Sequence, residues 1–220
     1  MRKGFPDKLV NIVFDTESVL GDPYSIQLFD GETANYSLHS REDILTTFIK
    51  YVKKRMRKGY QHYVWAHGLD FDLPMLLHKH HTLFSENYFE LSLPQYGVFL
   101  ECFTGKMTFA KMYVEDVGMV CIYDTFRFVT TSLEAACNDL KLEYKKLPRP
   151  DYLGKRAPRA EEDTSFREYA MADVYALYGL VQWEMDRIRE LDTQIPISLA
   201  QLASIVFRKK FIPTGQKINF

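Results

Sequence analysis

The stretch Leu9-Val10-Asn11-Ile12-Val13-Phe14-Asp15-Thr16-Glu17 decides how this chain is expected to fold. Its first six residues are mostly aliphatic or aromatic, which is typical of a buried strand. Two acids, Asp15 and Glu17, stand at its carboxyl end. Side chains two positions apart on a strand point to the same face, so these carboxylates would lie close together and repel. A divalent cation between them would offset the repulsion, although a turn at Asp15 and a helix cap at Glu17 would also explain the pair.

Length and composition bound the fold and the location of the protein. With 220 residues, of which 46% are hydrophobic, the chain is long enough for one well-filled core and is expected to form one main domain. Its 28 basic and 29 acidic residues give no overall positive field, so contacts with nucleic acid would have to come from local patches. The three cysteines, Cys102, Cys121 and Cys137, lack Cys-x-x-Cys spacing, which argues against a zinc site and a disulfide framework and favours a reducing, intracellular compartment. We see no secretory signal and no membrane span.

Strands and helices are expected to alternate along most of the chain. Alternating hydrophobicity and turn residues predict strands over residues 9–14, 24–29, 34–38, 62–66, 96–100, 107–114 and 119–123. Apolar residues at helical spacing predict helices over residues 41–58, 132–140 and 164–191, one that starts at Asp72 or just after it, and one from residue 198 onward. Asp72 would then serve as an N-cap. An irregular tail is expected over residues 213–220.

Residues 141–160 differ in composition from the rest of the chain. Seven basic residues against two acidic ones give this segment a net charge of +5, and it also contains three prolines and two tyrosines, Tyr144 and Tyr152. Cations can contact phosphates and aromatic rings can stack on bases, so the segment suits a single nucleic-acid strand. A solvated linker explains the composition equally well.

An acid also interrupts the apolar face of the helix expected over residues 164–191. Asp173 falls on the stripe that carries Phe166, Ala170 and Leu177, where a carboxylate is costly unless it is paired or bound to a metal. Tyr169 lies one turn earlier on the same side of the helix. The sequence therefore supplies four candidate acids, Asp15, Glu17, Asp72 and Asp173, with a phenol beside the last one.

These residues occur in segments that resemble a known set of motifs. Phe14-Asp15-Thr16-Glu17, Ala66-His67-Gly68-Leu69-Asp70-Phe71-Asp72 and Tyr169-Ala170-Met171-Ala172-Asp173 resemble the three motifs of DEDDy-type 3′–5′ exonucleases. This type is found as the proofreading domain of family B DNA polymerases, and the likeness is greatest to the protein-primed group of phages and linear plasmids. Tyr123-Asp124-Thr125-Phe126 is similar to a Tyr-Asp-Ser-Leu segment that contacts single-stranded DNA in that group. The Lys145-Lys146 pair lies where the group carries an assisting lysine, and the sequence does not decide between the two.

The resemblance implies a fold, a reaction and a set of site residues. The fold would be α/β and RNase H-like, with a mixed central sheet flanked by helices, and the exonuclease domain would span residues 1–195. Residues 196–220 resemble the link to a polymerase palm domain, but no polymerase signature follows. The activity would be hydrolysis of single-stranded DNA from its 3′ end by two Mg²⁺ or Mn²⁺ ions. Metal ligands would be Asp15, Glu17, Asp72 and Asp173, and Tyr169 would orient the attacking water. Candidate substrate contacts are Ser18, Trp65, His67, Phe71, Thr125, Phe126, Lys145, Lys146 and Tyr152.

Alternative functions remain open at this point. Gly68 stands where the resembling exonucleases usually have an asparagine that helps hold the 3′ end, so the grip on substrate is expected to be altered. The chain could instead be a catalytically weak module that binds single strands or a polymerase and other replication proteins. An RNA exonuclease would share the four acids, although such enzymes often carry histidine in place of Tyr169. The resemblance also fits a chain encoded by a virus, phage or linear plasmid.

Overall fold

The computed structural model describes residues 4–38 and 43–211. Part of the basic N-terminus, the first two residues of the helix expected over 41–58 and the tail expected over 213–220 lie outside these ranges. Within the described ranges, eight strands and several helices form an α/β fold.

One mixed sheet of eight strands organises the molecule, in the order β3-β2-β1-β4-β8-β7-β6-β5. The strands are β1 (Leu9–Val19), β2 (Asp22–Phe29), β3 (Ala34–Leu38), β4 (Gln61–Ala66), β5 (Tyr88–Leu93), β6 (Val98–Phe103), β7 (Phe109–Val114) and β8 (Gly118–Asp124). The three central strands β1, β4 and β8 run parallel, and the remaining neighbours pair antiparallel. Because a parallel pair needs a crossover, the chain passes through β2, β3 and one helix between β1 and β4, and through a helix and the strands β5 to β7 between β4 and β8.

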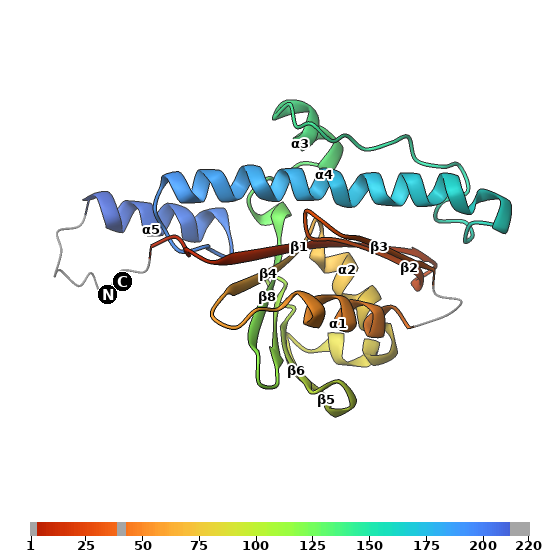
Figure 1. Ribbon diagram of the computed structural model, residues 1–220, viewed down its shortest axis with the longest axis horizontal. Coiled ribbons are helices and arrows are strands. Elements are labelled where there is room, and N and C mark those ends of the chain that lie inside the picture. Colours follow the sequence, from red (N-terminus) through yellow and green to blue (C-terminus); the bar gives the residue numbers. More distant parts are fainter. Residues whose placement is uncertain (1–3, 39–42, 212–220) are drawn as a thin grey trace.

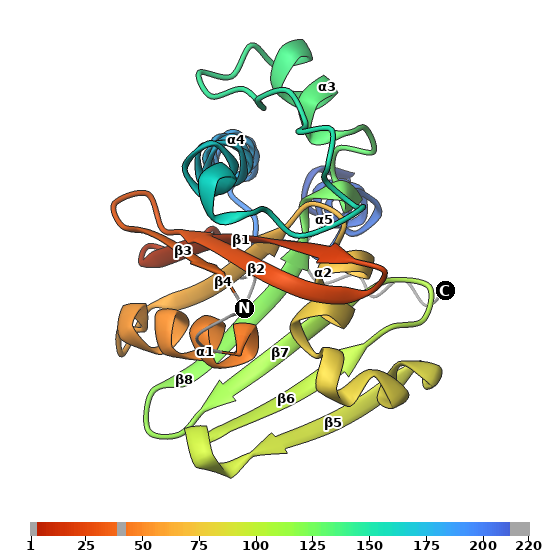
Figure 2. The same cartoon turned by 90° about the vertical axis from the view of Figure 1, so that its right-hand side faces the viewer.

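Helices cover the two faces of the sheet (Figures 1 and 2). The α-helices are α1 (Ile44–Arg55), α2 (Leu69–Leu76), α3 (Leu133–Asp139), α4 (Asp163–Glu190) and α5 (Leu199–Phe211), and four short 3₁₀ segments occur between them. Helices α1 and α2 pack on one face of β1 and β2, and the long helix α4 runs along the opposite face of the same strands. This arrangement confirms the predicted α/β class and is consistent with an RNase H-like fold.

Strand β1 is buried on both sides because its alternate residues enter two separate cores. Ile12 and Phe14 face α1 and α2 and belong to the larger core, whereas Val13 faces α4 and belongs to the second. The same alternation sends Asp15 and Glu17 toward α4. The carboxyl end of the central strand therefore presents its acids to the long helix.

The structure contains each predicted element that lies in the described ranges, and in addition strand β5, which was not predicted. One predicted helix boundary near the site is wrong. Helix α2 begins at Leu69, and its N-cap is Gly68 in the left-handed region at φ 101°. Asp72 is therefore inside the helix and buried, so its predicted role as an N-cap is wrong. Because glycine adopts the left-handed conformation readily, the helix begins three residues before Asp72, the earliest start that was predicted. No helix in the described ranges has both the length and the apolar character that crossing a membrane requires.

Candidate active site

Three carboxylates meet where the end of β1 lies against α4. Asp15, Glu17 and Asp173 each contribute an oxygen, and these three oxygens all lie within 4.8 Å of one another. Asp173 is 4% exposed, while Asp15 and Glu17 are partly exposed. The strand period places the first two acids on the α4 side, and the helix period places Asp173 on the buried face between Ala170 and Leu177. The predicted convergence of these acids is what the structure shows.

Asp72 joins this group from the other side of the strand. Its Oδ1 accepts hydrogen bonds from the Thr16 backbone N–H at 3.0 Å and from the Thr16 hydroxyl at 2.6 Å. Parallel pairing of β1 with β4 ends at Val13, so the N–H of Thr16 is not used by that ladder and can bond to α2. Because Thr16 lies between Asp15 and Glu17 in the sequence, its two hydrogen bonds hold Asp72 next to that part of β1. No pattern in the residues indicated this function of Thr16.

A lysine ammonium lies within the acidic group. Lys146 Nζ is 2.8 Å from Asp173 Oδ2, and the charges of Asp15 and Glu17 also attract the ammonium. The other oxygen of Asp173, Oδ1, is buried without a hydrogen-bond partner in the described part of the chain. Of the two lysines that the sequence left undecided, Lys146 is the one at the acids. Lys145 is exposed and does not line this pocket.

Crowding of the acids perturbs their protonation. Removal from water and the charge of Asp72 raise the pKa of Asp15 well above its ordinary value. Burial and Asp173 raise the pKa of Glu17 to about 7, against the opposing charges of Lys146 and Arg149. Burial raises the pKa of Asp72 to about 7 although its bonds to Thr16 favour the charged form. Without added positive charge, this group therefore retains protons near neutral pH.

Burial also raises the pKa of Asp173, and the ion pair with Lys146 and a hydrogen bond from Tyr169 oppose that rise. The Tyr169 side chain is 6% exposed and packs against Phe166, with ring centroids 6.4 Å apart. Burial, then the neighbouring carboxylates led by Asp173, raise the pKa of the Tyr169 hydroxyl, so it remains a neutral donor at physiological pH. The phenol therefore lies beside the carboxylates with its proton in place, as the motif spacing predicted.

The acids open into a pocket of about 390 Å³. Its lining includes the exposed ring of Phe71, which is 51% accessible, and the basic residues Lys146 and Arg149. Arg149 comes from the basic segment over residues 141–160, which is irregular apart from turns and a short 3₁₀ turn at its end. The pocket thus combines a carboxylate floor with cationic and aromatic side chains at its edge. Arg149 was only one of seven cations in the sequence count and was not singled out.

Two residues predicted to contact substrate are buried. Trp65 is 0% exposed, and its indole N–H donates to Asn11 Oδ1 at 3.0 Å inside the second core. Thr125 is also 0% exposed, and its hydroxyl donates to the Ala66 carbonyl at 3.1 Å. Trp65 lies on the central strand β4, whose side chains are covered on both faces, and Thr125 begins the 3₁₀ turn that follows β8. Their contact with substrate stays a prediction.

The other residues predicted to contact substrate have the following neighbours in the structure. The two His67 ring nitrogens pair with Thr125 Oγ1 and the Thr131 carbonyl, both at 2.8 Å, so this side chain ties β4 to the segment after β8. Phe126 is 39% exposed and stacks edge-on against His67. Tyr152 packs against the small apolar cluster that contains Tyr169, and the Arg156 guanidinium lies over the Tyr152 ring. Ser18 follows a bulge in β1 and does not line the pocket.

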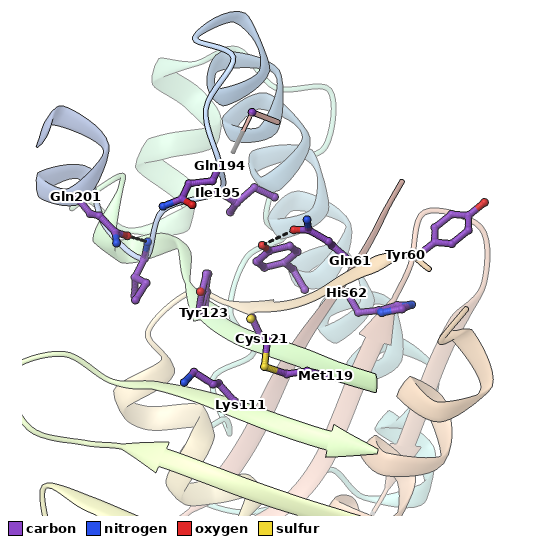
Figure 3. Close-up of a pocket in the computed structure, with 13 residues that line it drawn as sticks. Tyr60, Gln61, His62, Lys111, Met119, Cys121, Tyr123, Gln194, Ile195 and Gln201 are labelled. Carbon is purple, nitrogen blue, oxygen red and sulfur yellow. Dashed lines mark hydrogen bonds between the residues drawn. The ribbon is translucent and has the colours of Figure 1, made fainter. Parts of the chain in front are cut away.

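A larger pocket of about 500 Å³ lies elsewhere (Figure 3). Strands β7 and β8 form one side of it, with Lys111, Met119 and Cys121, and the α4–α5 connection forms the other, with Gln194 and Ile195. Its lining contains no carboxylate among the residues that the structure describes. We therefore place the candidate active site at the smaller pocket, because reactive groups rather than volume decide the chemistry.

The residues at the smaller pocket fit divalent cations of the Mg²⁺ type. All the candidate ligands are carboxylate oxygens, which hard cations prefer over nitrogen and sulfur. The partnerless Oδ1 of Asp173 is an available ligand atom, and the Lys146 ammonium shows that the group already attracts a positive charge. Asp15, Glu17 and Asp173 could hold one ion, whereas Asp72 lies outside this group and does not line the pocket, although its charge acts on Asp15.

Fold and site together define an RNase H-like α/β domain with a carboxylate pocket at the end of its central strand. Among solved structures, this domain is similar to part of Phi29 DNA polymerase. The structure complexed with single-stranded DNA aligns with a TM-score of 0.55 and 16% identity over 94% of this chain and 35% of the polymerase. The complex with primer-template DNA gives a TM-score of 0.54 and 14% identity over 94% and 36% of the two chains.

This chain spans about a third of the length of those polymerases. At such identities the similarity establishes a polymerase-related fold and nothing about activity. Comparisons with protein families and with curated proteins found no match.

Proposed function

We propose that this chain is a metal-dependent 3′–5′ exonuclease that removes nucleotides from single-stranded DNA, as a proofreading-type domain. The observation that supports this function best is the convergence of Asp15, Glu17 and Asp173 within 4.8 Å, with Tyr169 beside them. The polymerase-related fold supports it independently, since the similar Phi29 structures are complexes with single-stranded and primer-template DNA. Partners would be a DNA 3′ end and a polymerase or other replication proteins.

In the proposed reaction, water attacks the terminal phosphodiester. A new bond forms between the water oxygen and phosphorus, and the bond from phosphorus to the 3′ oxygen of the preceding nucleotide breaks. The products are a nucleoside 5′-monophosphate and a strand with a new 3′ hydroxyl, which takes up a proton. Divalent cations held by the four carboxylates would supply charge neutralisation and water activation for this step.

The protein side chains would position the water and the strand. Tyr169 keeps its proton and donates a hydrogen bond to Asp173 in the metal-free protein. With Asp173 bound to a metal ion, the hydroxyl would be able to donate to the attacking water instead and fix its direction. Phe71 offers an exposed ring on which the terminal base can stack, and Arg149 offers a cation to the phosphates at the pocket edge. Asp72 is anchored on Thr16, which holds its second oxygen in one orientation near β1.

A single-stranded deoxyoligonucleotide labelled at its 5′ end tests this function. With Mg²⁺ or Mn²⁺, the chain should shorten the strand stepwise from the 3′ end, and EDTA should stop the reaction. Asp173→Asn should abolish degradation, whereas Asp186→Asn, an exposed acid on the same helix, should leave it unchanged. Full activity of the Asp173 variant, or retained activity in EDTA, would refute the proposal. Binding without any turnover would instead support a module that only holds single strands.

A further inference from the structure

The Lys146 ammonium lies among the carboxylates of the acidic pocket. It lies 2.8 Å from Asp173 Oδ2, and Asp15 and Glu17 add to the attraction. The side chain is 28% exposed and comes from an irregular segment, so it is not locked by packing as a core residue would be. Lys145, its neighbour, is exposed and does not line the pocket, which makes it a natural comparison.

A charge count shows why this ammonium and a full set of metal ions compete. Asp15, Glu17, Glu134 and Asp173 line the pocket and Asp72 lies beside it, so these groups can carry five negative charges. Arg149 and two divalent cations would balance all five, and the lysine would then be one positive charge in excess. A divalent cation also binds carboxylate oxygens at about 2.0–2.6 Å, closer than the ammonium lies. Even an ion on the partnerless Oδ1 of Asp173 would lie close to the ammonium on Oδ2 of the same carboxylate, so the two positive charges would repel.

We propose that Lys146 is a built-in counter-cation, which holds Asp173 in the metal-free protein and leaves it when divalent ions bind. This inference rests on the proposed function, because it concerns the same carboxylates. Once displaced, the ammonium remains at the pocket edge near Arg149, where the phosphates of a bound strand would receive it. Lys146 would thus lower metal affinity in the free protein and assist the reaction when a strand is present.

This competition predicts opposite effects on two measurements. Lys146→Met should bind Mn²⁺ more tightly than the wild type in the absence of DNA, by about fivefold, which is the effect of removing one partly exposed ion pair. The same variant should hydrolyse DNA more slowly, because the displaced cation is missing. A lysine that only packs or stabilises the loop would not tighten metal binding.

Mn²⁺ titration of the full chain, followed by electron paramagnetic resonance at one fixed pH and salt concentration, tests the inference. Lys146→Met should show the lower Kd, and both Lys145→Met and Lys146→Arg should match the wild type. Circular dichroism should show that all three variants keep the fold. An equal or higher Kd for Lys146→Met would overturn the competition.

Asp173→Asn separates this failure from failure of the proposed function. If Asp173→Asn weakens Mn²⁺ binding but Lys146→Met does not tighten it, the metal site stands and only the competition is overturned. If Asp173→Asn binds Mn²⁺ as the wild type does, or if no variant binds Mn²⁺, the metal site and the competition are both overturned.

Discussion

Replacing Glu184 by glutamine should stabilise the folded chain, by an amount that grows as the pH rises. Glu184 lies on α4 and is 2% exposed, and neither of its carboxylate oxygens has a hydrogen-bond partner in the described ranges. Burial, with a smaller contribution from the charge of Asp124, raises the pKa of Glu184 well above its ordinary value. The folded protein therefore keeps a proton on this side chain under conditions in which the unfolded chain has lost it.

Proton linkage gives the size and the sign of this effect. Below the pKa of the unfolded chain, 4.5, both states carry the proton, and pH does not alter the contribution of Glu184 to stability. Between that value and the raised pKa of the folded state, only the folded protein carries it, so the wild type loses about 1.4 kcal/mol of stability per pH unit. Glutamine does not titrate. The stability difference between variant and wild type should therefore rise with that slope above pH 4.5.

Urea unfolding at several pH values between 4 and 8, monitored by circular dichroism, measures this difference. Protons taken up by the other buried acids occur in both proteins and cancel in the comparison. Glu168→Gln provides a control, because that side chain is exposed on the same helix and meets water in both states. A stability difference for Glu184→Gln that stays flat from pH 4 to 8 would refute the reasoning, since it would mean that the carboxylate is solvated or paired.

Three further variants test the site, in kinetic assays on single-stranded DNA. Tyr169→Phe should lower kcat with little change in KM, because the ring keeps its packing while the hydroxyl beside Asp173 is lost; an unchanged kcat would make Tyr169 a packing residue. Phe71→Ala should raise KM about tenfold with a similar kcat, as expected when stacking on one base is removed. Equal KM values would show that this ring does not touch the strand. Gly68→Asn should lower KM, because the resembling exonucleases usually have an asparagine here that helps hold the 3′ end. The side chain has room, since a Cβ at this position meets no atom within 4 Å, and the positive φ should cost about 1 kcal/mol of stability. A KM that does not fall would show that no amide is needed there.

Local periodicity predicted seven of the eight described strands, put Asp15 and Glu17 on one face of a strand and put Asp173 on a buried helical stripe. That these acids meet was implied by the resemblance of three motifs, because periodicity alone does not bring distant segments together. The start of α2 could not be inferred, since it depends on the left-handed conformation of Gly68, which the residue type permits but does not require. The anchoring of Asp72 on Thr16 was hidden for a similar reason, because it depends on where the β4 ladder ends.

Residues predicted to contact substrate were harder to assign than the acids. Trp65 and Thr125 were predicted to contact substrate because they lie in or beside the motif segments. Their burial depends on how the strands are ordered in the sheet, which the sequence does not reveal. Lys145 and Lys146 are neighbours of one type, and only the path of an irregular segment decides which reaches Asp173. Glu184 could have been found, because it lies three helical turns after Asp173 on the same face of α4.

The two elements that meet at the acids come from distant parts of the sequence, β1 near its start and α4 after all eight described strands. During synthesis, a growing polypeptide would expose Asp15 and Glu17 long before Asp173 left the ribosome. An incomplete product could not assemble the site at all. If the chain has the nuclease activity proposed above, nucleic acids near the translating ribosome would not be hydrolysed until α4 had packed on the sheet.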